Sequence, residues 1–375
     1  MLTKGDDYPI HQRPIPVLYT DTDRNFYDRY WFNGYSIKND EYFSMGLAEY
    51  PNVDIMDASF CVIKDGIQHN LRASRHMGME RLDTKVGPIA VEVLEPLKSL
   101  RVVIDENEHG ISADLTFTYR AIALEEPRNT YYIGSRMFND YTRLTQNGTW
   151  HGWINVKGDR IEVKPDSWFG TRDRSWGIRP VGARDTQPSV YNREPQFYWL
   201  WAPINFDDCI VLAHINTDAE GIAWNKNGVI VPLGDEGVPE EMEKVSIDID
   251  FKPGTRHAKS ATINLVTKDD KDIRIEVEPR FQIYMSGIGY GHPEWGHGYN
   301  KGKLAVGYDT IDLANVNETS FLYIHIQAVS RFTMGDKIGW GVMEQFILGR
   351  HLPSGFKDFA DCMDPQEMEF FKLLT

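Results

Sequence analysis

The sequence has no long apolar run. No stretch of about 18 consecutive apolar residues occurs in the 375-residue chain, so we expect no membrane-spanning helix. The chain begins MLTKGDDYPIHQRPIP and lacks the apolar segment of a secretory signal there. These two absences predict a cytoplasmic protein.

Positively charged residues are fewer than negatively charged ones. The chain carries 40 Lys and Arg residues against 55 Asp and Glu residues, which gives a formal net charge of -15 at pH 7. The phosphates of a nucleic acid and an anionic membrane surface both repel such a chain. We therefore expect neither as a partner.

Cysteine is scarce, and the common signatures of nucleotide-binding and nucleophilic enzymes are missing. The three cysteines, Cys61, Cys209 and Cys362, are an odd number and lie far apart. The first two have apolar neighbours, so we predict buried thiols without a disulfide. The chain contains no G-x-S-x-G, no G-x-x-x-x-G-K and no C-x-x-C. We expect no cofactor, neither a nucleotide nor zinc.

What the chain does contain is a pattern of short strands. Alternation of apolar and polar residues is clear in ISADLTFTYRAI and RIEVEPRFQIYMS. Turn signals at residues 64–66, 157–159 and 225–228 separate apolar runs, as hairpins require. The one good helix signal is DPQEMEFFKLLT, with Asp364 as N-cap, Pro365 at the first helical position and Glu367 closing a capping box. The pattern predicts an all-β protein with a short C-terminal helix.

The length and a polar seam at residues 182–195 indicate two domains. We place them at residues 1–190 and 191–375, each an antiparallel β-barrel or curled sheet that closes its own edges. Barrels of this kind enclose ligands, so we expect a hydrophobic small molecule as partner. The sequence leaves open whether the chain forms a homodimer.

Residues 166–180, DSWFGTRDRSWGIRP, combine aromatic rings with charge. In an extended chain Arg172, Arg174 and Trp176 share one face and Asp173 lies on the other. Two interpretations stay open: an Arg-Asp network that joins two sheets, and a ligand-binding site. We expect this segment to run from the first barrel to the second along a cavity wall.

A glycine-rich stretch at residues 284–302, YMSGIGYGHPEWGHGYNKG, is the second candidate. It is not a dinucleotide loop, because Pro293 and Trp295 stand where a helix would start. His292 and His297 are five residues apart, which does not fit a zinc-protease helix. We expect aromatic rings to crowd a pocket wall here, with His292 or Glu294 available for proton transfer.

Residues 196–208, QFYWLWAPINFDD, form the third candidate. Alternation places Trp199 and Trp201 on one face and Tyr198 on the other. The favoured interpretation is a strand buried on both faces within a barrel. Aromatic walls of this kind also suit a flat, apolar ligand.

Four stretches together resemble the carotenoid 1,2-hydratase (hydroxyneurosporene synthase) superfamily, in its two-domain branch: YWFNGYSIKNDEYFSMGLAEYP, DGIQHNLRASR, NGTWHGWINVKGDRIEVKPDSWFGTRDRSWGIRP and GYGHPEWGHG. The resemblance implies two consecutive lipocalin-like (calycin) β-barrels with a cavity for an apolar ligand. The matching segment in the hydratases reads Asp-His-x-Trp-Gly, and its His and Trp are assigned to the site. This chain keeps Asp173 and Trp176 but has Arg174 in place of the His. Arginine is no general acid at neutral pH, so it would instead bind a carboxylate or phenolate.

These observations favour a cofactor-independent lyase or isomerase of the hydratase, dehydratase or cyclase type. Its substrate would be a hydrophobic terpenoid-, steroid- or aromatic-like molecule. Asp173 and Glu294 are the candidate acids, and His292 and His297 are the candidate bases. The candidate substrate-binding residues are Arg172, Arg174, Trp176, Tyr198, Trp199, Trp201, Tyr290 and Trp295. The alternatives are a non-catalytic carrier or sensor of an apolar ligand and a metal-assisted hydrolase at the His292 and His297 loop.

Overall fold

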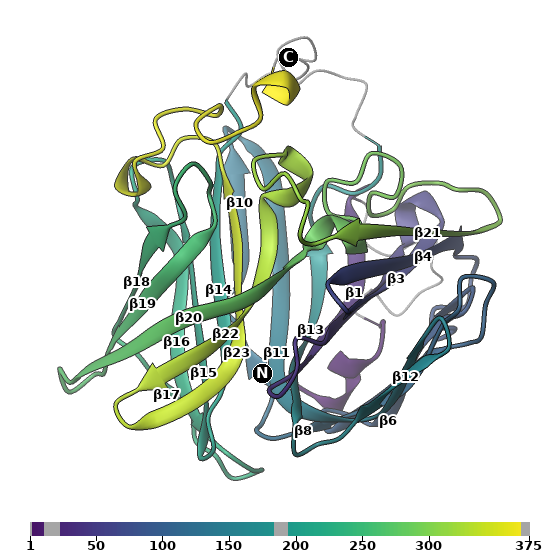
Figure 1. The fold of residues 1–375 in the computed structure, drawn as a ribbon, viewed down its shortest axis with the longest axis horizontal. Helices are drawn as coiled ribbons and strands as arrows, with labels where there is room; N and C mark the ends of the chain where they lie inside the picture. The colour runs from purple at the N-terminus through teal and green to yellow at the C-terminus, as the bar shows by residue number, and fades with distance from the viewer. Residues whose placement is uncertain (1, 11–22, 184–193, 369–375) are drawn as a thin grey trace. The chain divides into compact units, whose positions relative to one another are not determined.

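The structure, a computed structural model, describes residues 2–10, 23–183 and 194–368, and these residues form mostly antiparallel strands (Figure 1). The predicted all-β class is confirmed. The chain divides into a first unit, residues 1–191 with 287–313, and a second unit, residues 192–286 with 314–375. Residues 287–313 thus join the first unit although they follow much of the second in the sequence.

The first unit contains one sheet of 14 strands, whose main path runs β21-β4-β3-β2-β1-β13-β11-β8-β7-β6-β5. Strands β5 and β6 come back to contact β3 and β4, so the sheet nearly closes into a barrel. Its strands are β1 (Phe26–Ser36), β2 (Tyr42–Tyr50), β3 (Ile55–Lys64), β4 (Ile67–His76), β5 (Lys85–Val86), β6 (Ile89–Glu95), β7 (Ser99–Ile104), β8 (Ile111–Tyr119), β9 (Leu124–Glu125), β10 (Asn129–Ile133), β11 (Arg136–Val156), β12 (Asp159–Val163), β13 (Trp168–Ile178) and β21 (Leu304–Asp312).

The second unit contains a sheet of 9 strands in the order β17-β16-β15-β14-β23-β22-β20-β19-β18. Strand β18 contacts β15 and β16, so this sheet curls as a half-barrel. Its strands are β14 (Phe197–Asn205), β15 (Cys209–Thr217), β16 (Ala223–Pro232), β17 (Glu240–Glu241), β18 (Lys244–Phe251), β19 (Ala258–Val266), β20 (Asp272–Tyr284), β22 (His325–Met334) and β23 (Lys337–Leu348). The described residues also form short 3₁₀ helices: η1 (Lys4–Asp7), η3 (Pro51–Val53), η4 (Met285–Ile288), η5 (Phe321–Tyr323) and η6 (Leu352–Ser354).

Each unit has its own apolar core, made by the alternate residues that face its interior. The core of the first unit gathers side chains such as Phe32, Phe60, Phe117 and Trp150. The second core gathers others such as Leu200 and Phe332. The alternation read from the sequence is confirmed at β8, where every second residue faces the core, and at Ile273, Ile275 and Val277 of β20. A bulge between Pro279 and Phe281 ends it in β20.

Two of the three predicted turns are confirmed. Asp65 and Gly66, with φ of 51° and 78°, join β3 to β4, and Lys157 and Gly158, with φ of 53° and 99°, join β11 to β12. Both pairs have the left-handed backbone that a two-residue hairpin turn needs.

The turn predicted at residues 225–228 is wrong, because these residues lie inside β16 and pair with β15. A β-carbon at Gly228 would lie 2.6 Å from Val245 Cγ2 of β18, so the glycine marks a close packing contact.

The predicted C-terminal helix begins where the sequence places it. Residues 365–368 are helical, and Asp364 accepts a hydrogen bond from the Gln366 backbone N–H at 2.9 Å. The capping box is wrong: Glu367 instead accepts from the Ser320 hydroxyl and the Phe321 N–H, both at 2.7 Å. The end of the predicted helix lies outside the described residues.

Residues 168–178 do not run between the units. They form β13, which lies between β1 and β11 within the sheet of the first unit. The expectation of a segment crossing between barrels is therefore wrong. A central strand with neighbours on both edges satisfies the backbone of this charged segment within a single sheet.

The side chains of Cys61 and Cys209 are buried and form no disulfide in the part of the chain that the structure describes, as predicted. Within the described parts of the chain, no helix has the length and apolar character needed to cross a membrane.

Candidate functional site

The residues predicted for a site lie in three places. Arg172, Asp173, Arg174 and Trp176 are on β13; Tyr198, Trp199 and Trp201 are on β14; and Tyr290, His292, Glu294, Trp295 and His297 are in residues 287–303, called here the 287–303 loop. The first and third groups belong to the first unit, and the second group belongs to the second unit.

On β13 the two arginines point into the barrel of the first unit. Arg172 and Arg174 are both 0% exposed. Arg172 pairs with Asp7, and Arg174 Nη2 lies 2.6 Å from Asp28 Oδ1. The Arg174 guanidinium also lies 3.9 Å from the centre of the Tyr30 ring. This network occurs inside one barrel, so it does not join two sheets.

Asp173 and Trp176 are each half-buried. Strand alternation puts Asp173 on the face opposite the arginines. Burial raises the pKa of the Tyr27 hydroxyl, and the nearby Asp173 charge adds to this rise. Asp173 therefore lies among polar groups of the outer face and outside the pocket described below.

On β14, Trp199 belongs to a polar cluster of the second unit. Trp199 Nε1 donates to Glu344 Oε1 at 3.1 Å, and His325 Nε2 donates to the same oxygen at 2.9 Å. Gln327 Nε2 donates to Glu344 Oε2 at 2.7 Å. Trp201 is 1% exposed. His325 and Glu344 were not predicted, because each stands alone in the sequence within an ordinary strand pattern.

Tyr198 faces the other side of β14 and stacks on His351, with ring centres 3.9 Å apart. It is part of the second core.

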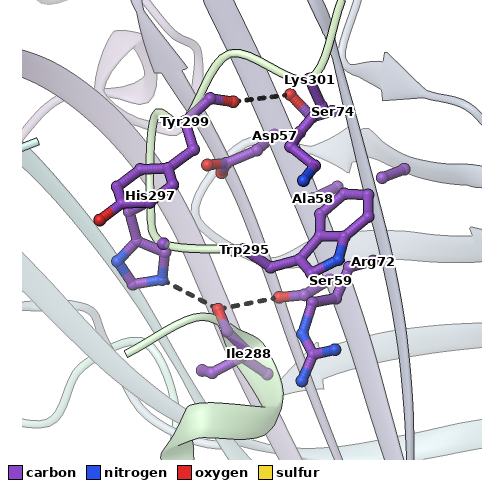
Figure 2. Close-up of a pocket in the computed structure, with 12 residues that line it drawn as sticks. Asp57, Ala58, Ser59, Arg72, Ser74, Ile288, Trp295, His297, Tyr299 and Lys301 are labelled. Carbon is purple, nitrogen blue, oxygen red and sulfur yellow. Dashed lines mark hydrogen bonds between the residues drawn. The ribbon is translucent and has the colours of Figure 1, made fainter. Parts of the chain in front are cut away.

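Two residues of the third group, Trp295 and His297, line a pocket of the first unit, which Figure 2 shows in close-up. Strands β3 and β4 form one wall and the 287–303 loop the other, enclosing about 290 Å³ including the open mouth. The lining residues are Asp57, Ala58, Ser59, Arg72, Ala73, Ser74, Ile288, Trp295, Gly296, His297, Tyr299 and Lys301. Trp295 and His297 are thus brought together, as the aromatic stretch suggested.

Asp57 is the carboxyl group on the strand wall of this pocket. Its Oδ2 accepts a hydrogen bond from the Gly298 backbone N–H at 2.7 Å, and its Oδ1 accepts from the Tyr50 hydroxyl at 3.2 Å. Burial raises the pKa of Asp57 to about 6, although the Gly298 bond and the Arg29 charge oppose the rise. A carboxyl group of this kind can exchange a proton near neutral pH.

His297 is the imidazole on the loop wall. Its Nε2 donates to the Ile288 carbonyl at 2.9 Å, as Figure 2 shows. This bond places the proton of the neutral imidazole on Nε2. The Tyr290 ring packs edge-on against His297, with centres 4.6 Å apart, and the Tyr290 hydroxyl accepts from Arg29 Nη1 at 2.6 Å. Strand β1 therefore holds the loop in place through Arg29.

His292 and Glu294 lie outside the pocket. His292 Nδ1 accepts from the backbone N–H groups of Glu294 and Trp295, at 3.1 and 3.0 Å, and its Nε2 lies 3.7 Å from Asp309 Oδ2. Glu294 is exposed. Among the residues that the structure describes, no group of three or more His, Cys, Asp or Glu side chains is placed to hold a metal ion.

Trp295 fits into the pocket because residue 307 has no side chain. A β-carbon at Gly307 of β21 would lie 2.3 Å from Trp295 Cζ2. On the ring itself, Lys301 Nζ lies 4.8 Å from the ring centre. The Trp295 ring therefore packs between the Lys301 ammonium group and the backbone at Gly307.

Gly307→Ala is expected to displace the Trp295 ring and to lower the free energy of unfolding by about 2 kcal/mol, because the added β-carbon overpacks the contact. Denaturation curves of the variant and the wild type measure this loss. Trp295→Phe removes the indole atom Cζ2 that the new β-carbon would contact. In a Trp295→Phe protein, Gly307→Ala should therefore lower the free energy of unfolding by clearly less. An equal cost in both backgrounds would show that the ring contact is not the cause.

Comparison with known proteins comes from one family model and from solved structures. A model described as a family of unknown function (DUF8625) matches residues 2–357. No curated protein matches the sequence.

Solved structures share the fold at low sequence identity. An AttH-like protein from Nitrosomonas europaea has a TM-score of 0.52 at 12% identity, covering 90% of this chain and 98% of that one. CghA, solved with Sch210972, has a TM-score of 0.50 at 11% identity, covering 91% and 96%. Kievitone hydratase from Nectria haematococca has a TM-score of 0.43 at 12% identity, covering 85% and 88%. The first two show that this chain shares their fold.

Proposed function

Because the chain belongs to the DUF8625 family of unknown function, we propose its activity from the pocket of the first unit: a cofactor-independent lyase or isomerase that moves protons on a small apolar molecule. The observation that carries the proposal is the Asp57 carboxyl, whose pKa burial raises to about 6, in a pocket that also contains His297. A general acid works best when its pKa lies near the working pH.

Asp57 is the proposed acid. In its protonated form it gives a proton to a leaving hydroxyl group or to an alkene carbon. The Gly298 N–H and the Tyr50 hydroxyl hold the carboxylate that remains, so the site does not need to rearrange after the transfer.

His297 is the proposed base. In the dehydration direction, its Nδ1 takes a proton from the carbon next to the one that loses the hydroxyl. The C–H electrons form the new double bond, and the hydroxyl leaves as water with the proton from Asp57. Transfer of the proton from His297 back to Asp57 through solvent resets the site, and hydration is the reverse of these steps. A cyclase or isomerase would use the same two groups without a net gain or loss of water.

The interior of the pocket is about 20 Å³, which is room for about one water molecule. Only the tip of an apolar molecule, such as one branched end, would therefore enter it, with the rest of the molecule at the open mouth. Tyr299 offers an aromatic ring that stabilises a developing carbocation. Lys301 can bind an oxygen at the far end of the substrate. Terpenoid-, steroid- and aromatic-like alcohols or alkenes meet these requirements. That CghA has been solved with Sch210972 supports a small-molecule role for this fold.

The test is a panel of such alcohols and alkenes, incubated with protein dialysed against a chelator and followed by mass spectrometry. We expect at least one compound to gain or lose the mass of one water, or to isomerise, in a protein-dependent way. Saturable binding without conversion would replace the proposal by a carrier or sensor. Activity that the chelator abolishes and zinc restores would replace it by metal-assisted chemistry.

A further inference from the structure

Residues 3–10, called here the N-terminal strap, pack against the arginines of β13 inside the first barrel. The strap includes η1 (Lys4–Asp7) and the half-buried Tyr8. Its polar groups reach both Arg172 and Arg174. None of the residues in these contacts lines the pocket.

Asp7 is held as a bound carboxylate would be. Its side chain is 0% exposed. One oxygen accepts from Arg172 Nη1, and the other accepts from Arg172 Nη2 at 3.2 Å and from the Leu97 backbone N–H. The Tyr30 hydroxyl donates to the Asp7 backbone carbonyl. A two-bond guanidinium contact with an extra backbone N–H is the usual way in which proteins recognise a carboxylate.

The neighbouring donors are only partly used by the strap. Arg174 donates to the Tyr8 carbonyl at 2.9 Å and to the Asp6 carbonyl at 3.4 Å. Its Nη1 is buried and has no hydrogen-bond partner among the described residues. Glu49 is 0% exposed, and both of its carboxyl oxygens also lack a hydrogen-bond partner among the described residues. Burial raises the pKa of Glu49 to about 9, so at neutral pH it carries a proton that it can donate.

From these contacts we infer that this end of the first barrel binds the carboxylate of a small apolar acid, in the place that Asp7 occupies. Arg172 would hold the carboxylate, and Arg174 Nη1 and the Glu49 hydroxyl would supply further donors. If the strap served stability alone, we would not expect Arg174 Nη1 and the Glu49 carboxyl to be buried without hydrogen-bond partners, because burying such groups unpaired costs free energy.

The rest of the site indicates the class of acid. The guanidinium groups lie over the rings of Tyr30 and Phe117. Pro9 of the strap is buried, so the strap also covers apolar surface there. An aromatic or medium-chain carboxylic acid, about the size of two strap residues, would replace both the charge and the apolar contact. This site is separate from the pocket and does not depend on its proposed activity.

The experiment is hydrogen exchange of the full-length wild-type protein with sodium benzoate or sodium octanoate. Both should bind saturably and speed amide exchange in residues 2–10, because the strap is displaced, while exchange in residues 287–303 stays the same. Benzyl alcohol and octanol, which lack the carboxylate, are the controls and should have no effect.

A variant gives the second measurement. Asp7→Asn weakens the strap as a competitor, so calorimetry should show binding of benzoate about tenfold tighter than to the wild type. Unchanged strap exchange and no saturable heat with either acid in the wild type would overturn the inference, whether or not the variant folds. Equal effects of the acids and the alcohols would also overturn it.

Discussion

Replacing Glu49 with glutamine is expected to raise the free energy of unfolding at pH 7 by about 3 kcal/mol. Burial, reinforced by the Asp28 charge, raises the pKa of Glu49 from 4.5 to about 9 in the folded protein. Between these values the folded state keeps a proton that the unfolded chain releases, so stability falls as the pH rises through this window. Glutamine has nearly the same shape and does not ionise, so it removes that loss.

Urea denaturation as a function of pH measures this effect. At about pH 4 the free energies of unfolding of the variant and the wild type should agree to within about 0.5 kcal/mol. As the pH rises, the free energy of unfolding of the variant should increasingly exceed that of the wild type. Glu108→Gln is the matched control, because the Glu108 side chain is 85% exposed and its loss should change nothing. If Glu49→Gln and the wild type were equally stable at every pH, Glu49 would not be held neutral by the fold.

Replacing Asp57 with asparagine is expected to lower turnover by about a hundredfold or more, because it removes the proposed acid. Asparagine keeps an oxygen for the Gly298 N–H, so the loop contact at 2.7 Å should survive. The rate for the wild type should fall as the pH rises above about 6, since Asp57 then loses its proton. The residual rate of the variant should lack this dependence.

The rate of conversion of any compound found active, measured from about pH 5 to pH 9, checks this prediction. The matched control is Glu294→Gln, which removes an exposed acid of the same loop that lies outside the pocket. It should leave the rate within about twofold of the wild type. A large loss with Glu294→Gln and none with Asp57→Asn would assign the acid to Glu294 instead.

Local signals in the sequence were enough to predict the strands and their faces. The alternation in β8 and β20 and the turn at Asp65 and Gly66 depend only on neighbouring residues, so they could be read directly. The glycine in β16 misled the prediction, because Gly228 makes room for Val245, which lies on another strand.

The site could be predicted only in part. The aromatic and histidine-rich stretch indicated Trp295 and His297, because these residue types are clustered there. Asp57 gave no signal, since IMDASFCVIK reads as an ordinary strand. The pocket forms only because residues 287–313 return to the first unit, where β21 pairs with β4. Such a pairing between distant segments leaves no local pattern in a single sequence.

The titration of the Asp57 carboxyl tests the central claim most directly, since the proposed chemistry needs this group to exchange its proton near neutral pH. Carboxyl-carbon NMR of aspartate-labelled protein, with Asp57→Asn to assign the signal, measures its midpoint without knowledge of the substrate. The account predicts a midpoint of about 6. A midpoint at or below about 4, the ordinary value for aspartate, would contradict it.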